Sequence, residues 1–142
     1  MFASRADNVY MRTSCVALLL VVAVSALAGC RPGGPIRIAS VQLGRALNTD
    51  NSVGAHTTQF KPSDTFYLAV LTEEPGASTL TVQWRLNGQI VSESTKDVSY
   101  MRPAATEFHL QNSGGFPVGQ YHVDVLVDGT VAESREFRVV EP

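Results

Sequence analysis

The feature that most constrains this chain is the alternation of apolar and polar residues in short runs between residues 36 and 140. Alternation with a period of two is typical of a β-strand with one buried face. Two of the breaks between runs are the pairs Asn87-Gly88 and Asp128-Gly129. Both pairs indicate tight hairpins, because both central residues of such a turn need a positive φ. No helical pattern is evident there, so the sequence predicts an all-β domain over residues 36–142.

The runs predict about seven strands, which suits a sandwich of two antiparallel sheets. The predicted strands are 36–43, 66–71, 80–86 with its continuation 89–91, 106–110, 121–127 and 131–140. Alternation also predicts which side chains face the core. They are Leu80, Val82, Trp84 and Leu86; Tyr121, Val123, Val125 and Val127; Phe108 and Leu110; and Phe66, Leu68 and Val70, although both faces of this last strand are apolar.

The motif Gly119-Gln-Tyr121, placed before a Val-rich strand, resembles the tyrosine corner of immunoglobulin-like (Ig-like) domains. Trp84 matches the position of their core tryptophan. Antibody domains also carry two disulfide cysteines, and the resemblance puts Val123 and either Leu68 or Val70 at those positions. The expected fold is therefore an Ig-like sandwich without a disulfide.

Three motifs of this domain also resemble a recurring module of bacterial envelope lipoproteins. They are Phe60-x-Pro-x-Asp64, the Trp84 strand with its Asn87-Gly88 turn, and Phe116-Pro-Val-Gly-x-Tyr121. The resemblance covers Ile36 to Val140 and concerns fold and location. It implies no catalytic activity.

The segment before this domain is predicted to be an export signal, residues 1–29. An apolar run from Cys15 to Ala28 follows Arg12 and is shorter than the roughly 20 residues of a membrane-spanning helix. Asp7 is unusual before such a run, and a start at Met11 gives a cleaner signal. We therefore treat Met11 as the alternative translation start.

The end of the signal, Leu27-Ala28-Gly29-Cys30, resembles the bacterial lipobox. The resemblance implies that the Cys30 sulfur receives diacylglycerol and that cleavage leaves Cys30 as the mature N-terminus. Two or three acyl chains, such as palmitate, anchor a protein firmly in a bilayer. The two alternatives are an ordinary secretory signal cut near Ala28 and an uncleaved anchor helix.

Residues 30–35 are expected to be the lipidated cysteine and a short Pro/Gly tether that holds the domain close to the membrane. Arg31 follows Cys30. In enterobacterial lipoproteins an Asp at this position favours retention in the inner membrane, so its absence favours the outer membrane, facing the periplasm. Once Cys15 is removed and Cys30 is acylated, the mature chain has no free thiol in an oxidising compartment.

Composition excludes several classes of function. The chain has 142 residues, 11 Lys and Arg against 13 Asp and Glu, and a net charge of −2, so no basic surface for nucleic acid is indicated. Two cysteines are too few for a disulfide-rich scaffold. Apolar residues make up 44% and charged residues 17%, which argues against disorder.

A search for catalytic and metal-binding patterns is largely negative, and we expect no enzymatic activity, no metal and no cofactor. His56, His109 and His122 lack the spacing of a metal site, and His109 and His122 are expected on opposite sheets. His122 and Asp124 share one strand face and can form a pair, but no nucleophile is evident beside them. Asn48-x-Asp50-x-Ser52-x-Gly54 faintly resembles a calcium loop but is better explained as a hydrated turn, because its glycine is one position late.

Recognition of a partner protein is the more plausible activity. The residues expected on outward faces are Thr81, Gln83, Arg85, His122, Asp124, Glu133 and Arg135. Tyr100, Met101 and Phe116 lie in loops, where they act either as binding anchors or as plugs at the ends of the core.

The sequence therefore favours two functions. The first is a membrane-anchored envelope lipoprotein whose non-catalytic Ig-like domain serves interaction or scaffolding, with an envelope protein as its partner. The alternative is a periplasmic enzyme inhibitor or immunity protein that binds through sandwich-end loops, with Asn112–Gly119 and Glu73–Ser78 as the candidate loops.

Overall fold

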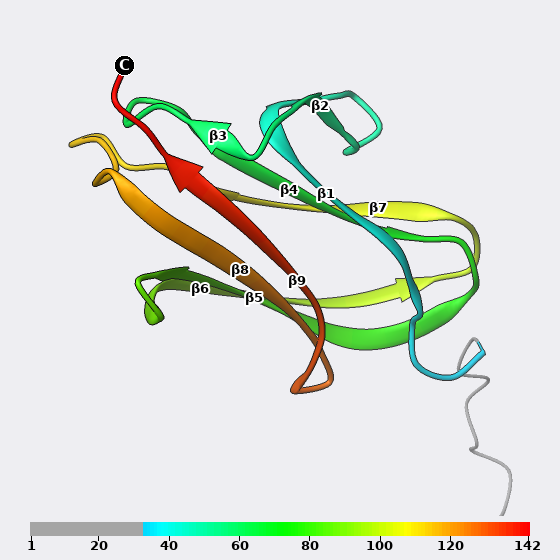
Figure 1. The fold of residues 1–142 in the computed structure, drawn as a ribbon. Coiled ribbons are helices and arrows are strands. Elements are labelled where there is room, and N and C mark those ends of the chain that lie inside the picture. The colour runs from blue at the N-terminus through cyan, green and yellow to red at the C-terminus, as the bar shows by residue number, and fades with distance from the viewer. Residues whose placement is uncertain (1–32) are drawn as a thin grey trace, which may run out of the picture. The chain divides into compact units, whose positions relative to one another are not determined.

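The computed structural model describes residues 33–142, so the predicted signal peptide, the lipobox and Cys30 lie outside the described residues. Nine strands form two sheets packed face to face (Figure 1). The strands are β1 (Ile38–Leu47), β2 (Val53–His56), β3 (Gln59–Phe60), β4 (Phe66–Thr72), β5 (Gly76–Leu86), β6 (Gln89–Tyr100), β7 (Ala104–Leu110), β8 (Gly119–Val127) and β9 (Thr130–Val139). Within this part of the chain, no helix has the length and hydropathy of a membrane span.

The five-stranded sheet has the order β3-β9-β8-β5-β6. All its pairs are antiparallel except β3 with β9. Both predicted hairpins are confirmed. The turn residues Asn87 and Gly88 have φ values of 50° and 82°, and Asp128 and Gly129 have 50° and 84°. These positive angles match the two-residue turns whose twist suits antiparallel strands.

The four-stranded sheet has the order β2-β1-β4-β7 and is antiparallel throughout. Its short strand β2, like β3 in the other sheet, has too few residues to show alternation and was not predicted. β2 approaches β1 very closely at Gly44, where an added Cβ would lie 2.6 Å from both the Ala55 carbonyl oxygen and Val53 Cγ1. Only glycine permits this approach.

The largest difference between the predicted and observed strands is the length of β6, which has 12 residues where alternation predicted only 89–91. The additional segment, Ser92 to Tyr100, is rich in polar residues and pairs on one side only, with β5. An edge strand need not bury a complete face, so apolar alternation is weak there. The number of strands is therefore nine rather than about seven.

The core between the sheets contains the predicted inward residues. Leu80, Val82, Trp84, Val123 and Val125 are fully buried, as are Phe66, Leu68 and Val70; Phe108 and Tyr121 are almost so. Leu86, Leu110 and Val127 are only partly buried, because they lie at or near strand ends where the core opens.

Aromatic rings gather at one end of this core around Phe66. Ring centroids lie 4.0 Å away for Phe116, 4.7 Å for Phe60 and 5.0 Å for Phe137. Edge-to-face and offset pairs of this kind add to the energy of burial. Phe60 was not among the predicted core residues because it lies in the unpredicted strand β3. Phe137 was missed because it shares the phase of Glu133 and Arg135, which were predicted to face outward.

The tyrosine corner is confirmed by its hydrogen bond. The Tyr121 hydroxyl donates to the Pro117 carbonyl oxygen at 2.8 Å, and burial raises the pKa of Tyr121. Val123, Leu68 and Val70, which the resemblance aligned with the disulfide cysteines of antibody domains, are fully buried apolar side chains.

Residues at the start of the described chain are bound to the sandwich. The Ala77 amide donates to the Gly34 carbonyl oxygen at 2.9 Å, and the Ile36 amide donates to Ser78 Oγ at 3.0 Å. Ile36 itself is 4% exposed. The last residues of the segment predicted as a tether are therefore fixed against the beginning of β5.

Candidate functional site

The outer face of the five-stranded sheet carries a connected set of polar side chains centred on Asp124. Arg85 Nε donates to Asp124 Oδ2 at 3.1 Å, and Ser134 Oγ donates to Asp124 Oδ1 at 2.6 Å. Arg85 also donates to Gln83, whose amide donates to Glu93 at 2.7 Å. Asp124 is only 9% exposed, although it lies on the outer face. We call Arg85, Asp124 and Ser134 the Asp124 network.

The predicted pairing of His122 with Asp124 is found in the structure. His122 Nε2 lies 3.5 Å from Asp124 Oδ2. Ser134, which sequence reasoning missed, provides a hydroxyl beside the same carboxylate. The order of the groups differs from a catalytic triad, in which histidine lies between serine and carboxylate and takes the serine proton. Here the carboxylate lies between the other two, and the Ser134 hydroxyl donates to it.

Two residues that were predicted to face outward, both on β9, have the phase of the inward-facing residues. Glu133 is paired in register with Val125, and Arg135 with Val123, so both share the phase of inward residues. Ser134 and Glu136 occupy the outer face instead, opposite Asp124 and His122. The phase of β9 is set by Phe137 and Val139, which are buried in the core. The prediction for Glu133 and Arg135 was therefore wrong by one residue.

The histidines are separated as predicted. His109 lies on β7 in the four-stranded sheet, and His122 lies on β8 in the other. Across residues 33–142, no three His, Cys, Asp or Glu side chains are grouped closely enough to hold a metal ion.

The segment that faintly resembles a calcium loop is a hydrogen-bonded turn between β1 and β2. Asp50 Oδ1 accepts both the amide and the hydroxyl of Ser52. These bonds lower the pKa of Asp50, the hydroxyl bond most. Asn48 Nδ2 donates to Ser52 Oγ at 3.0 Å. The side chains therefore satisfy one another, as in an ordinary Asx turn.

The three residues predicted in loops as anchors or plugs have different environments, and Tyr100 is the last residue of β6 rather than part of a loop. Phe116 is 7% exposed and stacks on Phe66, so it plugs the end of the core. Tyr100 is half-buried, and its hydroxyl lies 2.6 Å from Thr106 Oγ1. Met101 is 72% exposed and is the only one of the three with a largely free apolar side chain.

The two candidate binding loops lie at opposite ends of the sandwich. Leu86 pairs with Tyr121, so the 112–119 loop lies beside the end of β5. Leu80 pairs with Val127, so the predicted 73–78 loop lies beside the start of β5; because β5 begins at Gly76, the loop itself is only residues 73–75. One partner contacting a single end of the sandwich cannot use both loops, which corrects their combined assignment.

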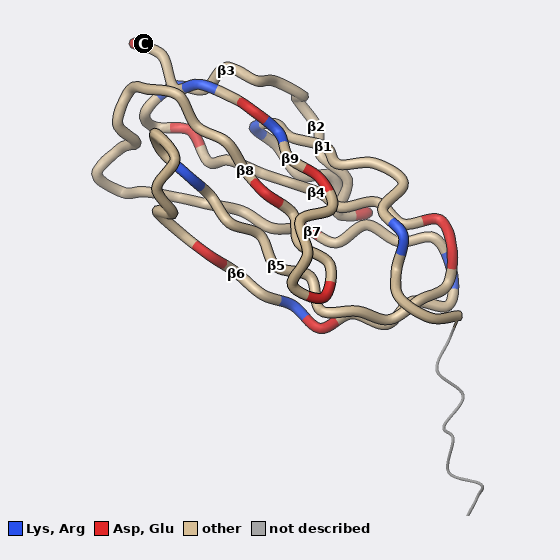
Figure 2. Tube along the Cα trace, turned by 60° about the horizontal axis from the view of Figure 1, so that its bottom comes forward, with Lys and Arg blue, Asp and Glu red and all other residues tan. Residues whose placement is uncertain are grey.

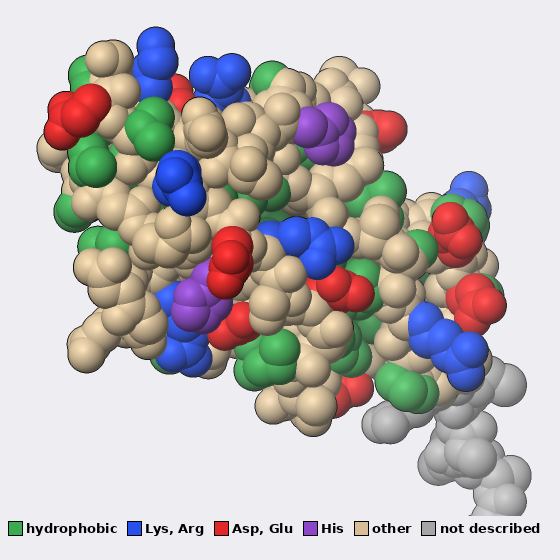
Figure 3. All heavy atoms as spheres, viewed as in Figure 1, with side chains coloured by type: hydrophobic (Ala, Val, Ile, Leu, Met, Phe, Trp, Pro, Cys, Tyr) green, Lys and Arg blue, Asp and Glu red, His purple; other side chains and the backbone are tan. Residues whose placement is uncertain are grey.

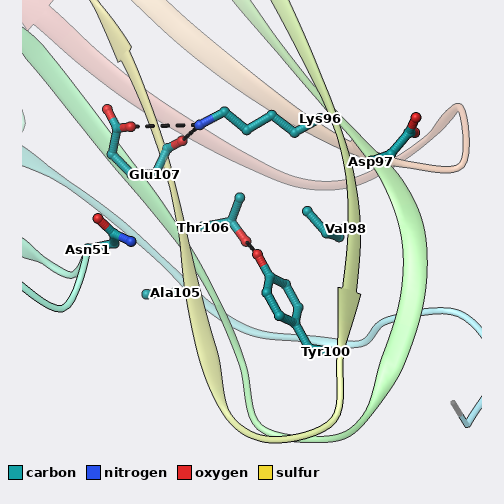
Figure 4. A pocket seen from close by; sticks show the side chains of 8 residues that line it. All are labelled: Asn51, Lys96, Asp97, Val98, Tyr100, Ala105, Thr106 and Glu107. Carbon is teal, nitrogen blue, oxygen red and sulfur yellow. Dashed lines mark hydrogen bonds and ion pairs between the residues drawn. The ribbon is translucent and has the colours of Figure 1, made fainter.

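A hollow of about 450 Å³ opens between β6 and β7, the two outermost strands on one side of the sandwich. Figure 4 shows the Tyr100 and Thr106 hydroxyls meeting in it and the Lys96 ammonium reaching Glu107. A second hollow of about 320 Å³ lies toward the other end of these strands. Its walls include Leu86, Val91 and Leu110.

Charges of both signs are dispersed over the domain. Figure 2 shows basic and acidic positions interspersed along the strands and loops. On the face seen in Figure 3, acidic and basic side chains likewise lie close together rather than in separate fields. A dispersed surface of this kind gives little long-range steering of a charged ligand.

Comparison with known proteins shows similarity at the level of fold. No family model matches the chain, and no curated protein matches it. An immunoglobulin-like protein from Pseudomonas aeruginosa matches with a TM-score of 0.51 and 15% identity, over 74% of this chain and 96% of that one.

Two enzymes contain more distant matches. An alkylpurine DNA glycosylase from Pseudomonas fluorescens gives a TM-score of 0.44 and 16% identity, over 70% of this chain and 30% of that one. A β-glucosidase from Listeria innocua gives 0.42 and 11%, over 70% and 16%. The domain described by residues 33–142 is therefore an Ig-like β-sandwich of nine strands.

Proposed function

We propose that the chain is a lipid-anchored lipoprotein of the bacterial envelope whose Ig-like domain acts in protein interaction or scaffolding. The observation that carries the proposal is the sequence Leu27-Ala28-Gly29-Cys30, placed after an apolar run of signal length. Ile36, only six positions beyond Cys30, is already buried against the sandwich. An acylated Cys30 would hold the folded domain next to the bilayer.

The test of the anchor is mass spectrometry of the mature N-terminus together with fractionation of Cys30→Ser. We expect the wild-type chain to begin at an acylated Cys30 and to fractionate with membranes. The Cys30→Ser chain should lose the lipid and leave the membrane fraction. Cys15→Ser is the matched control and should behave as wild type, because Cys15 belongs to the removed signal. A mature chain with an unmodified Cys30 thiol would refute the proposal.

The outer membrane, facing the periplasm, is the proposed location, because Arg31 rather than Asp follows Cys30. Density-gradient separation of the two membranes tests this assignment. Replacing Arg31 with Asp is expected to move the protein to the inner membrane in an enterobacterial host. An unchanged distribution would mean that this position does not direct sorting here.

The domain is proposed to be non-catalytic. Support comes from the Asp124 network, in which the Ser134 hydroxyl donates to a carboxylate that Arg85 also binds. In a catalytic triad a histidine lies between the serine and the carboxylate and takes the serine proton, whereas here the hydroxyl donates directly to the carboxylate. A reproducible hydrolase or transferase activity that disappears in His122→Ala would overturn this part of the proposal.

The alternative, an inhibitor or immunity protein, draws support from exposed apolar side chains at one end of the sandwich. Val118 is 49% exposed, Ile90 is 48% exposed, and Val91, which lines the smaller hollow, is 51% exposed. Photo-crosslinking from Val118 and, separately, from Met101 distinguishes the two ends. A periplasmic hydrolase captured through Val118 alone would favour inhibition, whereas capture of a structural envelope protein favours scaffolding.

A further inference from the structure

β6 and β7 are the outermost strands of their sheets on the same side of the sandwich. An edge strand presents unpaired amides and carbonyls that another chain can pair with. Natural proteins block such edges with charges, bulges or covering side chains. In this domain the neighbouring edges of β6 and β7 are blocked in different ways.

Lys96 crosses from one edge to the other. It pairs in register with Leu80, a fully buried residue, so its side chain leaves β6 on the inward face. The chain passes over the ring of Phe108 with Nζ 4.8 Å from the centroid. The ammonium donates to the Glu107 carbonyl oxygen and lies 3.7 Å from Glu107 Oε2, as Figure 4 shows.

The carbonyl that Lys96 binds belongs to the free edge of β7. In an antiparallel ladder the amide and carbonyl of one residue point to the same side, and successive residues alternate. Because the Glu107 carbonyl meets Lys96 rather than β4, the backbone groups of Ala105, Glu107 and His109 face the free edge. These residues are the ones an added strand would use.

The sequence of β7 is compatible with pairing to itself. In an antiparallel pair of two copies centred on Phe108, Glu107 of each copy lies opposite His109 of the other. Within one chain Glu107 Oε1 already lies 2.5 Å from His109 Nδ1, and in the paired arrangement each carboxylate also lies opposite the imidazole of the other copy, a position in which the two attract one another. The Glu107 carbonyl oxygen would then accept the amide of His109 of the second copy. In the structure that oxygen already accepts a hydrogen bond from the Lys96 ammonium.

The edge of β6 does not need such a cover. Glu93 and Asp97 lie on its outer face, in register with Gln83 and Thr79. Two copies of β6 paired about Thr95 with their outer faces aligned would place Glu93 opposite Asp97 twice. Like charges directly opposite one another destabilise a pair of strands. In that register β6 is protected by its own charges, whereas β7 is covered by a residue of the other sheet.

We propose that Lys96 keeps the β7 edge from pairing with β7 of a second copy of this chain. The occupant of the opened edge is a second copy, because the Glu107 and His109 side chains complement each other across the two-fold axis. The proposal does not depend on the lipid anchor and holds for the domain whatever its partner.

The test is the oligomeric state of Lys96→Ser, measured by native mass spectrometry of the full chain released from detergent micelles. Serine is expected to fold there, because Ser92 and Ser94 already occupy the same face of β6. We expect the dimer dissociation constant to fall at least about tenfold relative to wild type. Lys96→Gln, whose amide is too short to reach Glu107, should also dimerise. Lys96→Arg should stay like wild type, and so should Lys61→Ser, which removes an exposed lysine elsewhere.

A second substitution identifies the interface. Adding His109→Glu to Lys96→Ser places two carboxylates opposite each other in the predicted register, and we expect the monomer to return. Circular dichroism establishes that each variant is folded. Monomeric Lys96→Ser and Lys96→Gln variants, or association that persists with His109→Glu, would overturn the proposal.

Discussion

The two sheets bury similar inner faces but complete their outer faces in different ways. The outer face of the five-stranded sheet is held by the Asp124 network, in which a carboxylate is buried by its own hydrogen-bond donors. On the four-stranded sheet the outer face is closed by backbone at Gly44, where β2 lies so close to β1 that there is no space for a side chain. Ala69, on the outer phase of β4, is also fully buried.

A residue on the outward phase of an alternating strand is therefore not always exposed to solvent. Asp124 and Ala69 both have the outward phase, and both are buried. The burial of Asp124 is compensated by its polar partners, and that of Ala69 by packing.

The largest loss of stability is expected in the interior shared by both sheets. Trp84→Ala removes a fully buried side chain and leaves a cavity beside Phe66 and Phe137. The expected decrease in the free energy of unfolding is about 3–5 kcal/mol. Chemical denaturation followed by circular dichroism measures it. Val131→Ala, at a position 54% exposed on the same sheet, is the control and should change little. Wild-type stability in Trp84→Ala would show that the core is not where the fold places it.

The second largest effect is expected on the five-stranded sheet. Asp124→Ala removes the carboxylate that Arg85 Nε and the Ser134 hydroxyl bind, and we expect a loss of about 1–3 kcal/mol. Glu93→Ala is the matched control, because Glu93 is exposed, and should cost less than about 0.5 kcal/mol. Urea denaturation followed by Trp84 fluorescence compares them. Equal effects would mean that the network is no more than a solvated surface.

The third prediction concerns the four-stranded sheet. Gly44→Ala would put a methyl group 2.6 Å from the Ala55 carbonyl oxygen and displace β2, at an expected cost of about 1–3 kcal/mol. At Gly114 the nearest atom to an added Cβ is 3.5 Å away, so Gly114→Ala should be neutral or slightly stabilising. Hydrogen exchange of the β2 amides should increase in Gly44→Ala alone. Unchanged protection of β2 would contradict its role as a cover.

The smallest effect is a pH dependence in the turn that leads into β2. The Ser52 hydroxyl and amide hold the pKa of Asp50 below 3.8, so this carboxylate stabilises the folded state above pH 3.8. The contribution is lost as the pH falls through the lower pKa of the folded state. Asp50→Ala should therefore be less stable than wild type near neutrality and equally stable in strong acid. A difference that does not change with pH would show that the charge of Asp50 is irrelevant.

Features that depend on local backbone geometry and on alternation could be predicted from the amino-acid sequence. Asn87-Gly88 and Asp128-Gly129 fold as tight turns because only certain residues adopt positive φ without strain. The inward residues of β4, β5 and β8 were identified because side chains alternate across any strand. The tyrosine corner at Tyr121 was identified for a similar reason, since its hydrogen bond to Pro117 spans only four residues.

Contacts between strands distant in sequence became known from the folded structure, which brings those strands together. It placed Ser134 beside Asp124, buried Phe116 against Phe66, and set Lys96 across the edge of β7. It also separated the 73–78 and 112–119 loops to opposite ends. The physical reason is that alternation specifies which face a side chain takes but leaves the register between strands open. Register is settled only when two complete sheets pack, and the partners of each polar group follow from it.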